Sequence, residues 1–292
     1  MSFSPSPRFL LEQGGVIGAF VTGATRSLLP RRGEGVDHSE ILRLSRAPSL
    51  ALQEAYAAWS RARAGRYDGV IPPHLVNCQI ALPVISALTA RSPYPLLGVL
   101  NQGIHLAIHH PLPASAILTV RGHLVEASDD GARARIHSTL TVGTTETPVA
   151  MTIDAYAAVV LGKRKEGAAA PRETIDFQTV DRWQAAGDEG RKFFFLTGDF
   201  NPIHTWPAFA RRTSFKGCIM HGYGGFAQIF EAIRNAGWDI ADIDVKFVKP
   251  LPLPSPEVLI QVAARPDADG RHALRMIDDK HNLYQVGSFR PR

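Results

Sequence analysis

An internal repeat constrains the fold of this chain more than any other feature. Residues 104–113 and 243–252 share a pattern in which a run with alternating apolar residues ends in Pro-Leu-Pro, and the two segments are offset by 139 residues. The dipeptides Asp130-Gly131 and Asp269-Gly270 have the same offset of 139 residues. Self-similarity at a fixed offset is typical of a duplicated unit. We therefore predict two copies of one folding unit in tandem.

Both halves predict the same order of elements. An Asp-Gly dipeptide between two alternating apolar runs is typical of a tight hairpin. After the Pro-Leu-Pro block, strands are predicted at 116–125, 133–142 and 151–160 in the first half, and at 258–264, 272–278 and 283–289 in the second. Before each block, apolar residues recur at helical spacing: Ile80, Val84, Ile85 and Leu88, and then Phe226, Ile229, Phe230 and Ile233. The sequence therefore predicts an α+β protein in which each unit has one long helix and an antiparallel sheet.

The composition is that of a folded globular protein. Of the 292 residues, 45% are hydrophobic and 20% are charged, which excludes a largely disordered chain and allows one or two domains. The net charge of +5 favours an anionic partner, such as the phosphates of coenzyme A or an acidic carrier protein. Basic residues are spread singly, so nucleic-acid binding is not predicted.

Cysteine usage and hydropathy predict a cytoplasmic protein without a membrane span. Cys78 and Cys218 are the only cysteines and lack the spacing of a metal site, so neither a disulfide framework nor zinc is expected. Residues 69–90 lack formal charge, but their prolines and amides favour buried core over a bilayer helix. The apolar stretch 14–24 is too short for a secretory signal.

Three histidines, His105, His109 and His110, lie close together in the first repeat. No carboxylate or cysteine joins them in the sequence, so we predict a structural or pocket-rim role and no metal site.

The segment 197–204, with the sequence Thr-Gly-Asp-Phe-Asn-Pro-Ile-His, places a carboxylate and an imidazole five residues apart. Asn201 is a preferred N-cap and Pro202 suits the first helical position, so a short helix is predicted from Pro202 with His204 in its first turn. The partial positive charge at that helix terminus favours an ionised Asp199 and a neutral His204. The pattern predicts a carboxylate–imidazole pair that is able to take up a proton.

This segment resembles the signature of the MaoC-like dehydratases, which include the R-specific enoyl-CoA hydratases. That signature has an aromatic residue, a Ser/Thr-Gly-Asp-x-Asn-Pro-Ile/Leu-His run, an Ala and a His-Gly pair. The corresponding residues here are Phe194, Phe195, Thr197 to His204, Ala210, His221 and Gly222. The resemblance covers roughly Ser39 to the C-terminus and is strong from Phe193 to Gly225.

The resemblance implies a double hotdog fold and an acyl-thioester hydro-lyase. Asp199 and His204 would be the catalytic pair, Gly222 would offer its backbone N–H to the thioester carbonyl, and Asn201 and His221 would support them. The reaction would add water to trans-2-enoyl thioesters to give (R)-3-hydroxyacyl thioesters, or run in reverse, with no metal, flavin or nucleotide cofactor. The first unit lacks the catalytic run and resembles the degenerate half of two-hotdog relatives, which leaves room for a long acyl chain.

These patterns divide the chain into an N-terminal extension (1–38), a degenerate hotdog unit (39–161), a linker (162–171) and a catalytic unit (172–292). The substrate would be a thioester of coenzyme A or of an acyl carrier protein, and the protein would be a monomer or a homodimer. Candidate phosphate contacts are Arg211, Arg212 and Lys216, and Lys246 and Lys249 are alternatives. For the basic triplet 163–165, a solvated linker is favoured over phosphate binding.

One position departs from the family pattern. Relatives often carry a Ser or Thr three residues after the Gly of the His-Gly pair, whereas this chain has Gly225. Two other functions therefore stay open at this point: a hotdog thioesterase, and a non-catalytic protein that binds acyl thioesters.

Overall fold

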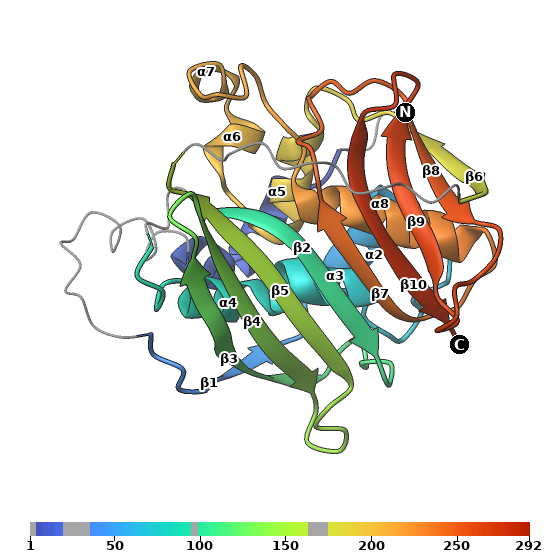
Figure 1. The fold of residues 1–292 in the computed structure, drawn as a ribbon. Coiled ribbons are helices and arrows are strands. Elements are labelled where there is room, and N and C mark those ends of the chain that lie inside the picture. Colours follow the sequence, from blue (N-terminus) through green and yellow to red (C-terminus); the bar gives the residue numbers. More distant parts are fainter. Residues whose placement is uncertain (1–3, 20–35, 95–98, 163–174) are drawn as a thin grey trace.

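The computed structural model describes residues 4–19, 36–94, 99–162 and 175–292, and the predicted linker triplet 163–165 lies outside them. All ten strands of the described chain form one antiparallel sheet in the order β1-β3-β4-β5-β2-β7-β10-β9-β8-β6 (Figure 1). The strands are β1 (Ile41–Arg46), β2 (Val99–Ile108), β3 (Ile117–Asp129), β4 (Arg133–Gly143), β5 (Met151–Val160), β6 (Phe177–Trp183), β7 (Ile240–Phe247), β8 (Val258–Ala263), β9 (His272–Asp278) and β10 (Leu283–Pro291).

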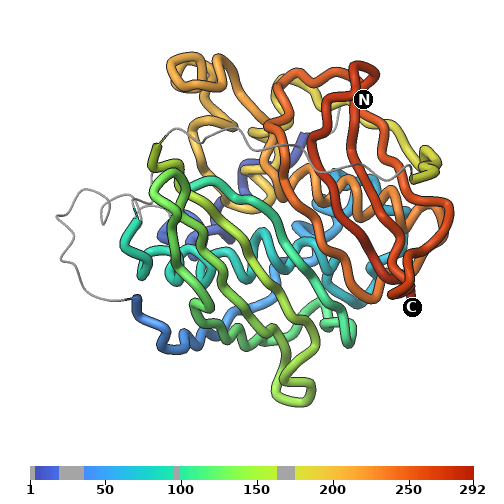
Figure 2. Tube along the Cα trace, viewed as in Figure 1, coloured from blue at the N-terminus to red at the C-terminus, as the bar shows by residue number. Residues whose placement is uncertain are grey.

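The two repeats meet at the centre of this sheet. Strand β2 pairs antiparallel with β7, and His105 lies opposite Asp244 in that pairing. Because these two residues occupy the same position in the repeat, the pairing is symmetric about them, and each half continues outward in the same strand order. Figure 2 shows the two halves of the chain side by side along the sheet. The duplication predicted from the sequence thus appears as a pseudo-twofold arrangement of strands.

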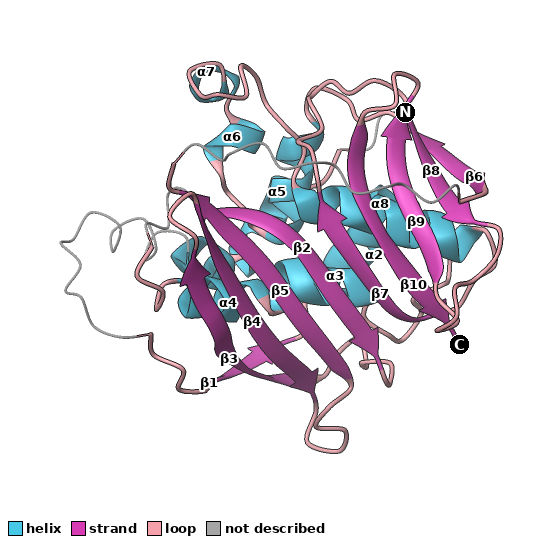
Figure 3. Ribbon diagram, in the orientation of Figure 1, coloured by secondary structure: helices cyan, strands magenta, loops and turns pink. Residues whose placement is uncertain are grey.

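The sheet is covered on one face by helices (Figure 3). The second unit has one helix of 14 residues, α8 (Gly222–Asn235), and the four apolar residues that predicted it are all buried. The apolar stretch 69–90 is also core, as predicted, because Ile71, Leu75, Ile80 and Leu88 are at most 1% exposed. Among the described residues, no helix has the length and apolar character to cross a bilayer.

The helix of the first unit is broken into three pieces, unlike the single long helix that the sequence predicted. The pieces are α3 (Pro73–Leu75), the π-helical η2 (Val76–Ile80) and α4 (Leu82–Thr89). Pro83 lacks the N–H that a continuous helix would use, and its ring conflicts with the carbonyl four residues earlier. The π-type bond from the Ala81 N–H to the Val76 carbonyl oxygen (2.8 Å) accommodates that break.

Several elements were not predicted. They are the edge strands β1 and β6, the helices α2 (Leu50–Trp59) and α5 (Glu189–Thr197), the short helices α6 (Pro202–Thr205, of which only the start was predicted) and α7 (Pro207–Ala210), and the 3₁₀ helix η1 (Pro7–Glu12). The limits assigned to the two units stay a prediction, with β1 to β5 falling inside 39–161 and β6 to β10 inside 172–292.

His105 has carboxylate neighbours, which the sequence interpretation did not foresee. Its Nδ1 lies 3.3 Å from Asp154 and its Nε2 lies 3.4 Å from Asp242, so the ring connects β5 with β7 across the junction of the units. The hydrogen bond with Asp154 and the nearby carboxylates raise the pKa of His105. Residues distant in sequence became its partners through strand pairing. No group of three metal-ligating side chains is placed to hold an ion in the described ranges.

Candidate functional site

The turn after α5 directs Asp199 into the protein. Gly198 ends the helix in the left-handed conformation (φ 78°), which costs an L side chain about 1–2 kcal/mol. A Cβ atom at Gly198 would also lie 2.7 Å from the Cβ of Gln13, which packs there from the N-terminal segment. The Thr197 hydroxyl donates to the Phe193 carbonyl (2.9 Å) and accepts from the Asp199 N–H (3.3 Å). The Asp199 residue is consequently only 5% exposed.

The helix predicted at Pro202 begins there. Asn201 is extended, and its Oδ1 accepts a hydrogen bond from the Ile203 N–H (3.2 Å), with Pro202 at the first position of α6. This local cap carries His204 in the first turn of α6, where it is partly buried.

The protonation of His204 follows from its hydrogen bond. Its Nδ1 lies 2.8 Å from the carbonyl oxygen of Ile219, and a carbonyl only accepts, so the proton resides on Nδ1. Burial lowers the pKa of His204 to about 4, and the ring is therefore neutral near pH 7. Its Nε2 is left as an unprotonated acceptor.

His221 connects the two predicted catalytic residues. Its Nε2 donates to the backbone carbonyl oxygen of Asp199 (3.1 Å), and its ring centroid lies 3.8 Å from that of His204. Burial and the adjacent His204 ring lower the pKa of His221 well below the usual value, because two charged rings at this distance would repel. Its Nδ1 is buried without a hydrogen-bond partner among the described residues.

The Asp199 side chain is buried without a hydrogen-bond donor in the part of the chain that the structure describes. Burial raises the pKa of this carboxyl group to about 7. The sequence interpretation, in which a helix terminus kept Asp199 ionised, is corrected here, because the loss of water outweighs a partial charge at the surface of a four-residue helix. The charge of Asp199 also contributes to the raised pKa values of Cys78 and Tyr223, after burial.

Helix α8 begins beside these residues. His221 is its N-cap but offers no side-chain cap, and the N–H groups of Gly224 and Gly225 both bond to the His221 carbonyl oxygen. The N–H groups of Gly222 and Tyr223 have no acceptor among the described residues, as is usual for the first turn of a helix. They form a donor pair at the positive end of the helix dipole.

Comparisons with known proteins show what the chain is similar to. The family model described as MaoC like domain matches residues 168–261. The peroxisomal hydratase-dehydrogenase-epimerase of Neurospora crassa is 27% identical over 198 residues, which are 61% of this chain and 21% of that protein. The chain thus spans about a fifth of the length of this curated relative. Residues 168–261 therefore form a MaoC-like domain.

Solved structures identify the fold of the chain. HtdX of Mycobacterium tuberculosis is 19% identical with a TM-score of 0.70, and the match covers 87% of this chain and 100% of HtdX. A second Mycobacterium tuberculosis protein, described as having a double hotdog fold, is 13% identical with a TM-score of 0.57 over 88% of this chain and 96% of its own. At these identities the likeness concerns the fold alone. The double hotdog predicted from the repeat is confirmed.

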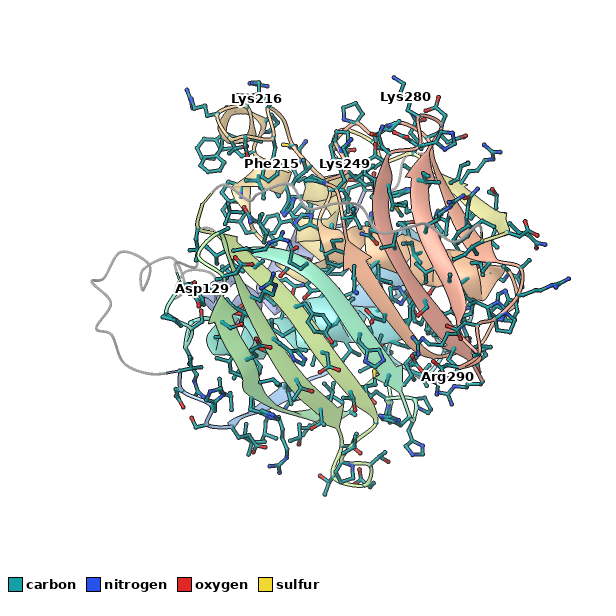
Figure 4. All side chains as sticks on the ribbon, in the orientation of Figure 1. Asp129, Phe215, Lys216, Lys249, Lys280 and Arg290 are labelled. Atoms are coloured by element: carbon teal, nitrogen blue, oxygen red, sulfur yellow. The ribbon has the colours of Figure 1, made fainter. Side chains whose placement is uncertain are left out.

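The basic residues considered for the acyl carrier are exposed. Arg211, Arg212 and Lys216 follow α7, and none of them has an ion pair within the described residues. Figure 4 shows Lys216 and Lys249 at the same end of the molecule. Lys249 donates to Asn282 (2.6 Å), and Lys246 is exposed on β7. Beside the arginines, the sequence interpretation missed two exposed aromatic residues, Trp206 and Phe209, whose rings stack at 6.2 Å.

Sequence reasoning also missed residues that lie at the Gly198-Asp199 turn. Cys78 comes from η2 of the first unit, Gln13 from the N-terminal segment and Tyr223 from α8. The Gln13 amide donates to the Leu196 carbonyl oxygen (2.9 Å) and accepts from Gln79 (3.2 Å), which ties three segments together. Only Tyr223 had a sequence signal, because it follows the His-Gly pair directly.

Proposed function

We propose that the chain catalyses the addition of water to trans-2-enoyl thioesters to give (R)-3-hydroxyacyl thioesters, and the reverse dehydration. The observation that carries this proposal is that His221, the N-cap of α8, contacts both Asp199 and His204. Asp199 is a buried carboxyl group and His204 a neutral imidazole, and neither the carboxyl group nor the Nε2 of His204 has a hydrogen-bond partner among the described residues. The name of the Neurospora relative includes a hydratase, which supports the same reaction class.

Asp199 would act as base and then as acid. The ionised carboxylate takes one proton from water as the water oxygen attacks C3, and the C2–C3 π electrons move toward the thioester carbonyl. The same proton then passes from Asp199 to C2, which completes the addition of one water molecule. A pKa of about 7 suits a group that must accept and return a proton near neutral pH.

His204 would hold the water rather than exchange a proton with it. Its Nε2 is an acceptor because Nδ1 carries the proton, so it receives the second hydrogen of the water. Burial disfavours a charge on His204 and keeps the ring neutral in this role.

The N-terminus of α8 would stabilise the negative charge that develops on the thioester oxygen. The N–H groups of Gly222 and Tyr223 provide two donors, and loss of one donor of this kind costs about 3–4 kcal/mol in other enzymes. The addition needs a base for the water, an acid for C2 and donors for the thioester oxygen; Asp199 would serve as base and acid, and these N–H groups would be the donors.

Substitution of the two proposed catalytic residues tests this function. Asp199→Asn and His204→Gln should each abolish turnover of a short enoyl-CoA, followed by loss of its conjugated absorbance, while circular dichroism remains unchanged. Asp176→Asn and His123→Gln, both at exposed positions, are the matched controls and should retain activity. Wild-type rates in either catalytic variant would show the assignment to be wrong, and release of free thiol without a hydroxyacyl product would identify a thioesterase.

A further inference from the structure

The first turn of α8 rests on one cross-strand pair of side chains. A Cβ atom at Gly222 would overlap the ring of Phe247, and a Cβ atom at Gly225 would overlap the side-chain Nε2 of Gln285. Phe247 and Gln285 lie opposite each other in the antiparallel pairing of β7 with β10. The two glycines therefore permit close contact between the helix terminus and these two side chains.

Gln285 makes a specific bond to this helix terminus. Its side-chain Nε2 donates to the carbonyl oxygen of Gly222 at 2.8 Å, and the residue is 5% exposed. The pairing of β10 with β9 shifts register between Leu283 and Gln285. Irregularities of this kind re-aim side chains, and they are over-represented next to active sites.

The other end of the Gln285 amide has no partner. Its Oε1 is buried without a hydrogen bond to any described residue. An unpaired buried acceptor destabilises a fold, and an apolar side chain of similar size would avoid that cost. The presence of glutamine at this position therefore indicates that the bond made by its Nε2 matters.

The bond acts on one of the two donors at the start of α8. The carbonyl of Gly222 and the N–H of Tyr223 belong to the same planar peptide group. By holding the carbonyl, Gln285 fixes the direction of the Tyr223 N–H, and hydrogen bonds in such a chain also polarise one another.

We propose that Gln285 is a positioning residue that orients the oxyanion donors of α8, and that it works as a pair with Gly225. In this chain the Gln285 amide occupies the space that a side chain at position 225 would fill, where relatives often carry a hydroxyl group. The inference rests on the proposed hydratase function and names a residue that this function requires. It also explains why Gly225 does not indicate loss of the site.

Gln285→Leu tests the positioning role, because leucine keeps an apolar side chain in place but removes the donor. We expect kcat to fall roughly tenfold, equivalent to about 1.4 kcal/mol, with KM nearly unchanged, because the donors act on charge that develops in the transition state. The pH dependence of the rate should not move, since Asp199 is untouched. Gln178→Leu, at an exposed position of β6, is the matched control. A wild-type kcat in Gln285→Leu would overturn the positioning role.

A double-mutant cycle tests the pairing. Gly225→Ser should lower activity at least tenfold and lower stability in the presence of Gln285, because the new side chain overlaps the amide. The double variant Gly225→Ser/Gln285→Ala should regain activity relative to Gly225→Ser, since the overlap is gone. Additive losses would overturn the pairing. A wild-type chain without any turnover of enoyl thioesters would overturn the proposed function and the positioning role. Urea unfolding of the wild type, Gly225→Ser, Gln285→Ala and the double variant would still decide the pairing.

Discussion

At the scale of single residues, burial sets the protonation of the site. Asp199 has a pKa raised to about 7, whereas His204 has a pKa lowered to about 4, and both shifts have the loss of water as their first cause. Burial favours the uncharged form of each group. Near neutral pH the histidine is therefore an uncharged acceptor, and the carboxyl group is the one that changes its charge.

The pH dependence of the rate should accordingly follow Asp199. Because the reaction needs the ionised carboxylate, kcat/KM for hydration should rise with pH, be half of its maximum near pH 7 and level off above pH 8. His204 and His221 are neutral from pH 5 to 9, so their titration should not change the rate in this range. Rates measured from pH 5 to 9, with unfolding followed at each pH, check this expectation. A rate that falls between pH 5 and 7 would contradict it.

The residue-level predictions succeeded where the determining interaction is local. The cap of Asn201 and the start of α6 at Pro202 were predictable because donor and acceptor lie two residues apart. The environment of Asp199 was not, because Gln13 and Cys78 reach the Gly198-Asp199 turn from segments more than 100 residues away in sequence. The raised pKa of Asp199 depends on that enclosure, so the sequence alone suggested the opposite shift.

At the scale of elements, α6 and α7 form a corner that carries aromatic and basic side chains. Trp206 is 56% exposed and stacks on Phe209, and Arg211 and Arg212 follow directly. Aromatic rings and guanidinium groups together suit a nucleotide, whose base stacks and whose phosphates accept charge-assisted hydrogen bonds. This corner is therefore our proposed contact for the nucleotide end of coenzyme A.

Removal of the two arginines should weaken substrate binding without slowing the chemistry. We expect Arg211→Ala/Arg212→Ala to raise KM for an enoyl-CoA roughly five- to tenfold with kcat unchanged, the pattern for interactions equal in ground and transition states. An enoyl-pantetheine thioester, which lacks the nucleotide, should show no such change. Arg121→Ala/Arg135→Ala, on strands of the first unit, is the control pair. Equal changes in KM for both substrates would refute the contact.

Elements themselves were predictable in proportion to their periodicity. Strands such as β4 were predicted from alternating apolar residues, and α8 was predicted from apolar residues at helical spacing. In both, the apolar residues of the pattern are buried. Strands β1 and β6 lie at the sheet edges and expose one face, so their patterns were weak. The broken helix of the first unit had a visible cause in Pro83, but its π-turn depends on tertiary packing around 76–81.

At the scale of the whole molecule, the first unit contacts the long helix of the second unit through a buried ion pair. Glu231 lies on α8, is fully buried, and accepts hydrogen bonds from Arg66 and Tyr67 of the first unit. His74 of the first unit lies beside it but is neutral, because burial lowers its pKa to about 3. The positive charge beside Glu231 therefore comes from Arg66, whose guanidinium nitrogen lies 2.6 Å from a carboxylate oxygen of Glu231. The first unit thus contributes to the position of α8.

Removal of that charge should show how strongly the units depend on each other. Arg66→Ala leaves Glu231 buried without its cation, and the loss of one partner of a buried pair costs about 3–5 kcal/mol of unfolding free energy. Glu231→Gln in the same background should recover much of this loss, because a neutral amide needs no counter-charge. Arg63→Ala is the matched control, since Arg63 is exposed and its side chain donates to the Asn235 carbonyl oxygen. Guanidinium unfolding is measured for the wild type, Arg66→Ala, Glu231→Gln, the double variant and the control Arg63→Ala. The first four proteins give the coupling free energy between Arg66 and Glu231. An Arg66→Ala loss no larger than that of Arg63→Ala would mean that the units are held together by apolar packing and the shared sheet alone.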